Sequence, residues 1–409
     1  MRRILANLLW EDDLAPRRTT PPRTVLETVS GLATLLRVFA QDGDHLWTPS
    51  PVDPERVREV PGVSRPILES GPLDTLPPAE ATLAWGATAP SQCRDAPRGT
   101  PWGVSGAAMS SAPPQTPRGQ IEEDGTNLSA SETTHGVPRG ASLHWGKALH
   151  DLLWTLPSPS SAIAANVHHR AFCLQVAEEL GCVLPGSQIV ESLSILDRLL
   201  ASPHSPRAWV LKAPLSASGR HRYIERNGPR ISDSRSRKTV ERLFEHHGPL
   251  LFEPWMNRTA DFGVSALLDS SGLRIVGIHG QQVDAKGQFA GIDLQPVLSA
   301  AERTRLLETV ELVGAALQRK GYVGPFGIDA WRYRKESGEE ILHPLGEINA
   351  RMTFGLVAWT LAERVEGAAR LRFGRNLPAA TEGRNIEIVP LLAPGSAKGS
   401  AAWIEQATP

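Results

Sequence analysis

Two strand-like runs in the last quarter of the chain constrain its fold more than any other feature. They are "GPFGIDAWRYR" (324–334) and "EILHPLGEINAR" (340–351), and only a short glycine-containing connection separates them. A connection of this length joins antiparallel neighbours, since parallel strands need a long crossover. The two runs should therefore pair and bring Asp329 near Glu347.

Side-chain alternation then groups the polar residues of this hairpin. Successive strand residues point to opposite faces, so Glu347 and Asn349 share a face at ~7 Å, and Arg351 joins them if the strand continues. Asp329 lies between Ile328 and Ala330 and so points away from the apolar face.

Two facing carboxylates suggest a metal ion. They repel each other, and when buried they require a cation or a proton. Mg²⁺ takes one or two carboxylates and completes its shell with water and substrate phosphates. The alternative is a solvated hairpin face, which the apolar neighbours disfavour. The candidate metal ligands are Asp329, Glu347 and Asn349.

A lysine in an apolar strand provides a second element. Lys212 lies in "WVLKAPLSASGR", and Ser216, Ser218 and Gly219 follow it in a loop. A lysine fixed in a strand can reach phosphate oxygens, while loop N–H groups cover them. The alternative is a strand-end lysine whose stem is buried and whose amine reaches water. The chain contains no G-x-x-x-x-G-K-[ST] phosphate-binding loop.

The stretch "LLFEPWMNRTADFGV" provides a third candidate element of a binding site. Glu253 ends an apolar run, and Asp261 precedes the next strand. A segment that connects two lobes can hold an adenine, and a carboxylate beside it can accept ribose hydroxyls. The alternative is ordinary turn chemistry, in which aspartate is common.

Strands and helices alternate along the chain, which predicts an α/β fold. Residues 3–10 and 81–88 read as short buried strands around a helix within 22–40. The segment 89–140 is rich in Pro, Gly and Ser and predicts disorder or a surface insertion. Later patterns predict one helix from about 165 to Gly181, a hairpin turning at Asp269–Gly272, a helix over 299–320 and another from Gly355. After 376 we expect one strand and a flexible tail.

Composition gives no sign of a nucleic-acid or membrane partner. The formal net charge is −1, and no apolar run approaches the ~20 residues that span a bilayer. Three scattered cysteines do not form a disulfide framework or a zinc site. The N-terminal apolar run meets acidic residues too early for a signal peptide. We expect a cytoplasmic protein.

Taken in order, these elements resemble the ATP-grasp superfamily, which includes D-alanine–D-alanine ligase, biotin carboxylase and glutathione synthetase. The matching stretches "WVLKAPLSASGR", "LLFEPWMNRTADFGV", "PFGIDAW" and "GEINAR" lie within residues 161–375. The resemblance implies an α/β domain at 1–160, an ATP-grasp module at 161–375 and a C-terminal strand and tail at 376–409. Within the module it implies a small lobe at about 161–256 and a large lobe at about 257–375.

The resemblance also implies site residues. ATP would lie between the lobes with Mg²⁺, for which Mn²⁺ could substitute, on Asp329, Glu347 and Asn349. Lys212 would contact the phosphates or the adenine side, and Arg351 the γ-phosphate or an acyl phosphate. Arg170 is the candidate for a basic residue that the family has near the start of the module. The remaining candidates are the 216–220 loop over the triphosphate, with Ser216, Ser218 and Gly219; the segment from Phe252 to Met256 along the adenine, with Glu253, Pro254, Trp255 and Met256; and Asp261 on the ribose.

Most enzymes of this superfamily activate a carboxylate as an acyl phosphate and join it to an amine. The expected function is such a ligase acting on small molecules, with Arg220, Arg222 and Arg351 as candidate carboxylate binders. Trp10, Glu11 and Asp12 could face the acceptor, or be ordinary surface. The alternatives are a phosphotransferase acting on a hydroxyl or on a histidine such as His279 or His343, and a non-catalytic ATP-binding protein. Dimers are common in the superfamily, so a homodimer is an open possibility.

Overall fold

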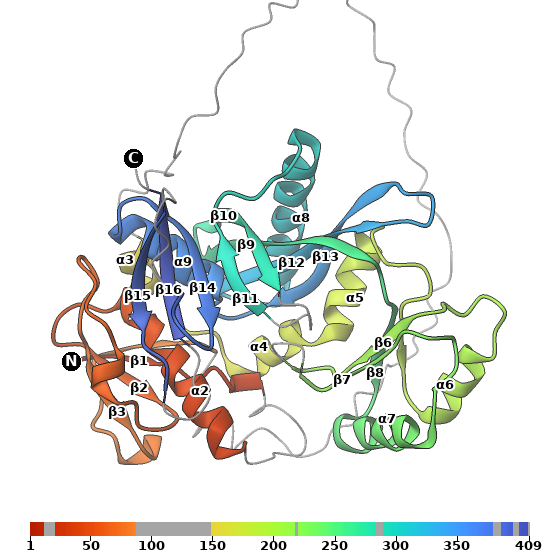
Figure 1. Cartoon of the computed structure of the whole chain (residues 1–409), viewed down its shortest axis with the longest axis horizontal. Coiled ribbons are helices and arrows are strands. Elements are labelled where there is room, and N and C mark those ends of the chain that lie inside the picture. The colour runs from red at the N-terminus through yellow and green to blue at the C-terminus, as the bar shows by residue number, and fades with distance from the viewer. Residues whose placement is uncertain are drawn as a thin grey trace, which may run out of the picture.

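The computed structural model describes residues 1–11, 21–86, 149–216, 220–283, 289–378, 386–395 and 401–407. These residues form an α/β fold, as the sequence predicted, and their strands make three sheets (Figure 1). The expected insertion at 89–140 lies outside the described residues.

The N-terminal sheet is parallel, with strand order β3-β2-β1-β4. Its apolar strands pack against a helix that tightens into a 3₁₀ turn, and this turn is fully buried. The sequence predicted both short strands and the helix. The elements are β1 (Arg2–Leu5), α2 (Arg23–Ala33), η1 (Thr34–Phe39), β2 (His45–Thr48), η2 (Pro54–Arg56), β3 (Ile67–Ser70), η3 (Leu73–Thr75) and β4 (Ala81–Ala84).

The small sheet is antiparallel, with order β5-β8-β6-β7, and α6 and α7 pack on one of its faces. Alternate residues of its central strands, such as Leu211 and Phe252, face these helices and are fully buried. Lys212 and Glu253 therefore point to the other face. The elements are β5 (Gln188–Val190), α6 (Leu193–Leu200), β6 (Trp209–Lys212), β7 (Arg222–Glu225), α7 (Ser234–His247) and β8 (Leu250–Pro254).

The large sheet has eight antiparallel strands in the order β13-β12-β9-β10-β11-β14-β16-β15. The predicted hairpin turns between β9 and β10, and a capping box of Ser299 and Glu302 starts the predicted helix α8. The elements are β9 (Arg258–Asp269), β10 (Gly272–Val283), β11 (Phe289–Asp293), α8 (Ala300–Arg319), β12 (Gly324–Arg334), β13 (Glu340–Asn349), α9 (Phe354–Arg364), β14 (Ala368–Gly374), β15 (Ile386–Leu392) and β16 (Ala401–Ala407).

A pair of helices, preceded by α3 (Leu149–Thr155), connects the N-terminal sheet to the other two. The sequence predicted one helix here, but the structure has α4 (Ser161–His168) and α5 (Arg170–Glu179) with an extended residue, His169, between them. The His169 side chain caps α5 by accepting a hydrogen bond from the Ala171 N–H at 3.1 Å. This break places Arg170 in the first turn of α5.

The C-terminal segment differs from the expected single strand and flexible tail. Besides β15, the chain forms β16, which pairs with both β14 and β15. Ala402 and Ile404 are buried and alternate with Trp403 and Glu405, the period-two pattern of a half-buried strand. Among the described residues, no helix is long and apolar enough to cross a membrane.

Candidate active site

The predicted hairpin of β12 and β13 brings two carboxylates together. Asp329 is paired directly with Glu347 across the strands, so their side chains share one face of the large sheet. Asn349 lies on the same face and donates from Nδ2 to the Asp329 Oδ2 at 3.1 Å. The structure therefore confirms the predicted proximity of all three side chains.

Burial and neighbouring charges shift the pKa values of Asp329 and Glu347 in opposite directions. Burial raises the pKa of Asp329 to about 6, and the neighbouring charge of Glu347 adds to the effect. Burial acts in the same direction on Glu347, but the Arg170 guanidinium, 3.0 Å away, opposes it together with His168 and Lys212, and the pKa of that carboxyl is lowered. Glu347 is thus held ionised, while Asp329 is the acid that lacks a cation.

The sequence did not reveal Gln281 as a neighbour of this pair. Gln281, on β10, donates from Nε2 to the Asp329 Oδ1 at 2.6 Å. It lies two strands away from Asp329, and only the order β12-β9-β10 places the two side chains together. No local sequence signal could have found it.

Arg351 lies just beyond the end of β13 and has well-defined partners. It donates to the Asn349 Oδ1 at 3.0 Å and to the Met352 carbonyl at 2.9 Å, and its Nε donates to Glu11. His168 lies 3.7 Å from the same Glu11 carboxylate and accepts a hydrogen bond from the Ala350 N–H.

The contact between Arg351 and Glu11 corrects both interpretations that the sequence left open for Trp10 and Glu11, an acceptor-facing site or ordinary surface. Glu11 and Trp10 are neither surface residues nor exposed to an acceptor, since their exposed fractions are 0% and 1%. Glu11 instead holds Arg351, and the Trp10 ring packs edge-on against His168. Asp12 lies outside the described residues.

Lys212 and its neighbours form the opposing surface on the small sheet. The Lys212 amine forms an ion pair with Glu253 on β8, and Arg222 is its direct partner on β7. Burial lowers the pKa of Lys212, Glu253 opposes this shift, and Arg170 and Arg258 add to it. Burial and the nearby Arg258 and Arg170 likewise lower the pKa of Arg222.

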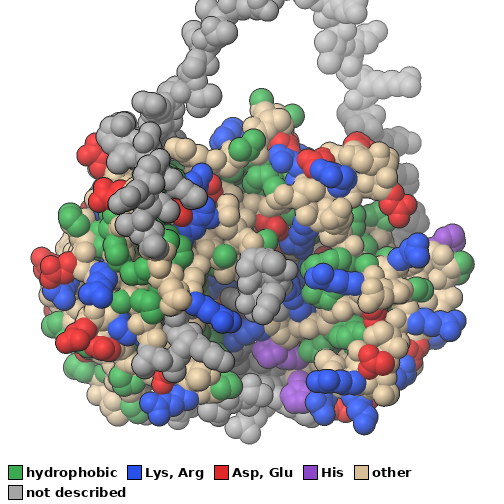
Figure 2. Space-filling view, in the orientation of Figure 1, with side chains coloured by type: hydrophobic (Ala, Val, Ile, Leu, Met, Phe, Trp, Pro, Cys, Tyr) green, Lys and Arg blue, Asp and Glu red, His purple; other side chains and the backbone are tan. Residues whose placement is uncertain are grey.

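These cations repel one another and so favour an anion between the sheets. Figure 2 shows Lys and Arg side chains gathered near the centre of this face of the molecule. Contact between Lys212 and phosphate stays a prediction.

Arg170 connects the two sheets. Its guanidinium pairs with Glu347 on the large sheet and donates to the Ala213 carbonyl at 2.9 Å and the Ser216 hydroxyl at 3.3 Å beside the small sheet. Ser216 is itself buried. Ser218 and Gly219 lie outside the described residues.

The adenine contacts of the connecting segment after β8 remain a prediction. Phe252 faces the small-sheet core, whereas Met256 packs against the cluster of Leu184, Trp331 and Tyr333. Asp261 forms an ion pair with Arg258 at 3.0 Å. Trp331, absent from the predicted site, is two residues from Asp329 and is Asp261's direct partner across β9 and β12.

The two histidines considered as phosphoryl acceptors are buried. His279 and His343 have exposed fractions of 4% and 5%, and burial lowers the pKa of each to about 4. His279 lies close to Gly263 and Gly355, where an added Cβ would collide with its ring. The His343 ring packs against Trp331 at a tilt of 39°, with ring centroids 4.5 Å apart.

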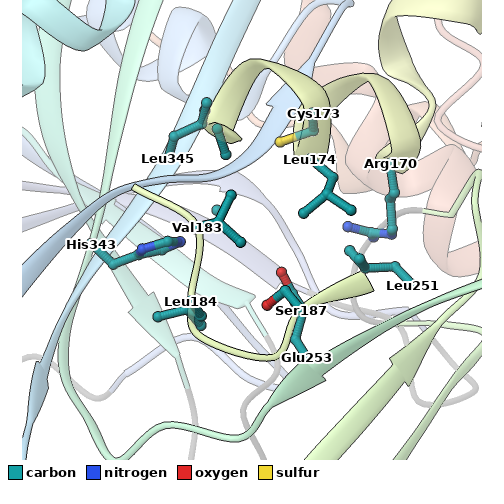
Figure 3. Close-up of a pocket in the computed structure, with 12 residues that line it drawn as sticks. Arg170, Cys173, Leu174, Val183, Leu184, Ser187, Leu251, Glu253, His343 and Leu345 are labelled. Carbon is teal, nitrogen blue, oxygen red and sulfur yellow. The ribbon is translucent and has the colours of Figure 1, made fainter. Parts of the chain in front are cut away.

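A pocket lies beside the Arg170 and Glu253 side chains (Figure 3). α5, the segment before β5, β8 and β13 supply its walls. The figure shows His343 and Arg170 on opposite sides, with leucine side chains around them.

The oxygen donors of the hairpin fit Mg²⁺. Asp329 and Glu347 supply carboxylates, and Asn349 carries an amide oxygen that here accepts from Arg351; such oxygens are the hard donors that this ion takes together with substrate oxygens. The raised pKa of Asp329 is what a carboxylate short of a cation shows. Among the described residues, there is no group of three or more His, Cys, Asp or Glu side chains that could hold a metal ion by itself. A metal here would therefore also need Asn349 and oxygens from outside the protein.

No family model matches the sequence, and no curated protein matches it. Solved structures are similar in part. The beta-gamma-ATP complex of biotin carboxylase from Campylobacter jejuni is 15% identical, with a TM-score of 0.44, over 61% of this chain and 65% of that one. An ADP complex of N5-carboxyaminoimidazole ribonucleotide synthetase is 12% identical, with a TM-score of 0.41, over 59% and 67%.

D-alanyl-alanine synthetase A from Vibrio cholerae is 13% identical, with a TM-score of 0.39, over 51% of this chain and 63% of that one. The matches thus span about two thirds of each of these three proteins. The chain is thus similar in part to these three proteins, and its resemblance to the ATP-grasp superfamily rests on the sequence motifs.

Proposed function

We propose that this chain is an ATP- and Mg²⁺-dependent ligase of the ATP-grasp type. It would activate a small-molecule carboxylate as an acyl phosphate and join it to an amine, such as an amino acid or a peptide-like substrate. The observation that carries the proposal is the paired Asp329 and Glu347 on the large sheet, facing the Lys212, Arg170 and Arg222 cations.

Each side chain has a role in this proposal. Asp329, Glu347 and Asn349 would hold Mg²⁺, which neutralises phosphate charge. Lys212 and Arg222 add fixed positive charge for the phosphates, and charge placed in advance is effective where water is excluded. Arg351, held by Glu11 and Asn349, lies where it can orient the transferred group.

The reaction would place little covalent work on the protein. The carboxylate oxygen attacks the γ-phosphorus, ADP leaves, and the amine nitrogen then attacks the acyl carbon and displaces phosphate. Alignment and charge neutralisation are the main contributions in such transfers. Ser216, Ser218 and Gly219 belong to the segment proposed to cover the phosphates. Glu253, Pro254, Trp255, Met256 and Asp261 are proposed for the nucleoside.

The alternatives find less support. A phosphohistidine mechanism needs an accessible imidazole, but His279 and His343 are buried. A non-catalytic ATP-binding protein would be indicated by a missing metal ligand, whereas Asp329, Glu347 and Asn349 share one face. We retain as proposals the domain division at about residues 160, 256 and 375, and the homodimer.

The test is ATP turnover with Mg²⁺ and pooled amino acids, peptides and small carboxylates, with ADP, AMP and phosphate scored separately. We expect ADP and phosphate to rise with one pool. Production of AMP and pyrophosphate would contradict an acyl phosphate, and failure to bind ATP would overturn the proposal.

Two variants on the hairpin complete the design. Asp329→Asn keeps the side-chain shape but removes a proposed metal ligand, so turnover should disappear. Glu340→Gln changes a more exposed acid at the start of β13 that pairs with Arg334. It should keep wild-type turnover, since Glu340 lies away from the carboxylate pair.

A further inference from the structure

Trp331 is a large aromatic side chain on the site face of the large sheet. It lies two residues from Asp329 on β12 and opposite Asp261 on β9, so all three side chains share that face. The Lys212 amine is 5.8 Å from the ring centroid, and Met256 packs against the cluster that Trp331 forms with Leu184 and Tyr333. Trp331 therefore borders the residues proposed for the nucleoside.

The planar guanidinium of Arg258 already covers one face of the Trp331 ring. The guanidinium carbon of Arg258 lies 3.7 Å from the Trp331 centroid, which is a stacking distance. The same guanidinium lies 6.0 Å from the Trp255 ring and donates to Asp261 at 3.0 Å. Arg258 thus covers the aromatic ring and also engages the carboxylate proposed for the ribose.

The indole N–H of Trp331 nevertheless lacks a hydrogen-bond partner among the described residues. The exposed fraction of Trp331 is 3%, and this N–H is buried. A buried N–H without an acceptor is unfavourable. The N–H lies in the plane of the ring, so an acceptor atom at the ring edge would relieve that cost, which the Arg258 guanidinium over the ring face, having only donors, does not.

We propose that Arg258 acts as an internal substitute for a nucleobase: it covers Trp331 in the ligand-free chain, and a purine nucleoside displaces it and stacks on the ring. This inference rests on the proposed function, because it assumes a nucleotide between the sheets. The displacement would also release Asp261, whose carboxylate then becomes available to ribose hydroxyls.

The contacts of Arg258 allow this movement. Its side chain is 32% exposed, and its ion pair with Asp261 is formed by two residues close in sequence at the start of β9. Partly exposed pairs of this kind contribute little to stability. Arg258 can therefore leave the ring without disturbing the core, whereas Trp331 cannot.

The test is calorimetric binding of adenosine and of ADP to the full chain and its variants. Adenosine carries the base and ribose without phosphate charge, so loss of an arginine cannot weaken it through phosphate contacts. Arg258→Ala should tighten adenosine binding by about 2–5-fold, the range that a partly exposed ion pair allows. Trp331→Leu should weaken it by about tenfold or more, as loss of base stacking does, and Trp331→Phe should retain binding.

Arg332→Ala is the matched control. Arg332 also pairs with an acid, Glu302, and lies 5.3 Å from an aromatic ring, Phe262, but it follows Trp331 in β12 and points to the opposite face. It should leave adenosine affinity unchanged.

The outcomes separate the two proposals. If ADP binds but adenosine affinity is unchanged in Arg258→Ala and in Trp331→Leu, the stacking inference is wrong and the proposed function stands. If the wild-type chain binds neither adenosine nor ADP, both are wrong.

Discussion

Arg351 and Glu11 are 340 residues apart in the sequence and form an ion pair between the end of β13 and the segment after β1. Glu11 is completely buried, and Arg351 also donates to Asn349, which in turn donates to Asp329. The N-terminal sheet is thereby connected through two side chains, Glu11 and Arg351, to Asn349 and Asp329, which are proposed metal ligands.

Glu11→Gln should weaken both the protein and the site. The substitution leaves Arg351 without a compensating charge in a buried setting, which costs about 2–4 kcal/mol. We expect the free energy of unfolding in urea to fall by that amount, and turnover by at least tenfold. Asp44→Asn is the control, because it removes another ion pair of the N-terminal sheet, with Arg2, and should leave turnover unchanged. Equal losses of turnover in both variants would contradict a specific role for Glu11.

Asp329→Asn should stabilise the metal-free protein at neutral pH. Because burial raises the pKa of Asp329 to about 6, the folded state binds a proton more tightly than the unfolded chain between about pH 4 and 6. That contribution is present at low pH and lost as the pH rises through 6, so ionised Asp329 costs about 1–3 kcal/mol at pH 7. Thermal unfolding without Mg²⁺ should show a higher Tm for the variant at pH 7.5 and a smaller difference at pH 5. A lower Tm of the variant than of the wild type at pH 7.5 would show that the ionised Asp329 carboxylate does not destabilise the folded state.

The affinity for Mg²⁺ should increase as Asp329 loses its proton. A metal ligand must be deprotonated, so apparent Mg²⁺ affinity in the presence of ADP should rise with pH up to about pH 6–7 and then level off. Calorimetric titrations between pH 5 and 8 measure this directly. An affinity that is independent of pH over this range would exclude Asp329 as a ligand.

Arg170 and Glu347 should be strongly coupled. Removing either partner alone leaves a buried charge and should cost about 3–5 kcal/mol, whereas the double change Arg170→Met with Glu347→Gln should cost less than the two single losses together. Urea unfolding of the four proteins gives the coupling energy. The exposed pair Arg319 and Glu179 offers a comparison, with expected coupling below about 1 kcal/mol.

The sequence predicted those parts of the site that depend on neighbouring strands and local alternation. Asp329, Glu347 and Asn349 lie together because a short connection and a period of two determine a hairpin. Glu11, Gln281 and Trp331 could not be assigned in this way. Their roles depend on strand order and on contacts between sheets, which leave no pattern along the chain.

The same distinction applies to the fold. The hairpin at Asp269–Gly272 and the helix α8 follow from turn and capping residues. The break before Arg170 was missed because the apolar pattern continues through it, and the interruption comes from a single capping histidine.

Gly346→Ala should test how Trp331 is held. The register of β12 and β13 shifts between Asp329 and Trp331, and the Trp331 ring lies so close to Gly346 that an added Cβ would collide with three ring atoms. The ring would have to move, at a cost of about 1–3 kcal/mol, as in other overpacked sites. Gly280→Ala in β10 is the control, because its nearest neighbour, the Asp293 Cβ, would be 3.5 Å away. We expect unfolding free energy to fall, and adenosine binding to weaken, only in the Gly346 variant. If the two variants behave alike, Gly346 does not position the ring.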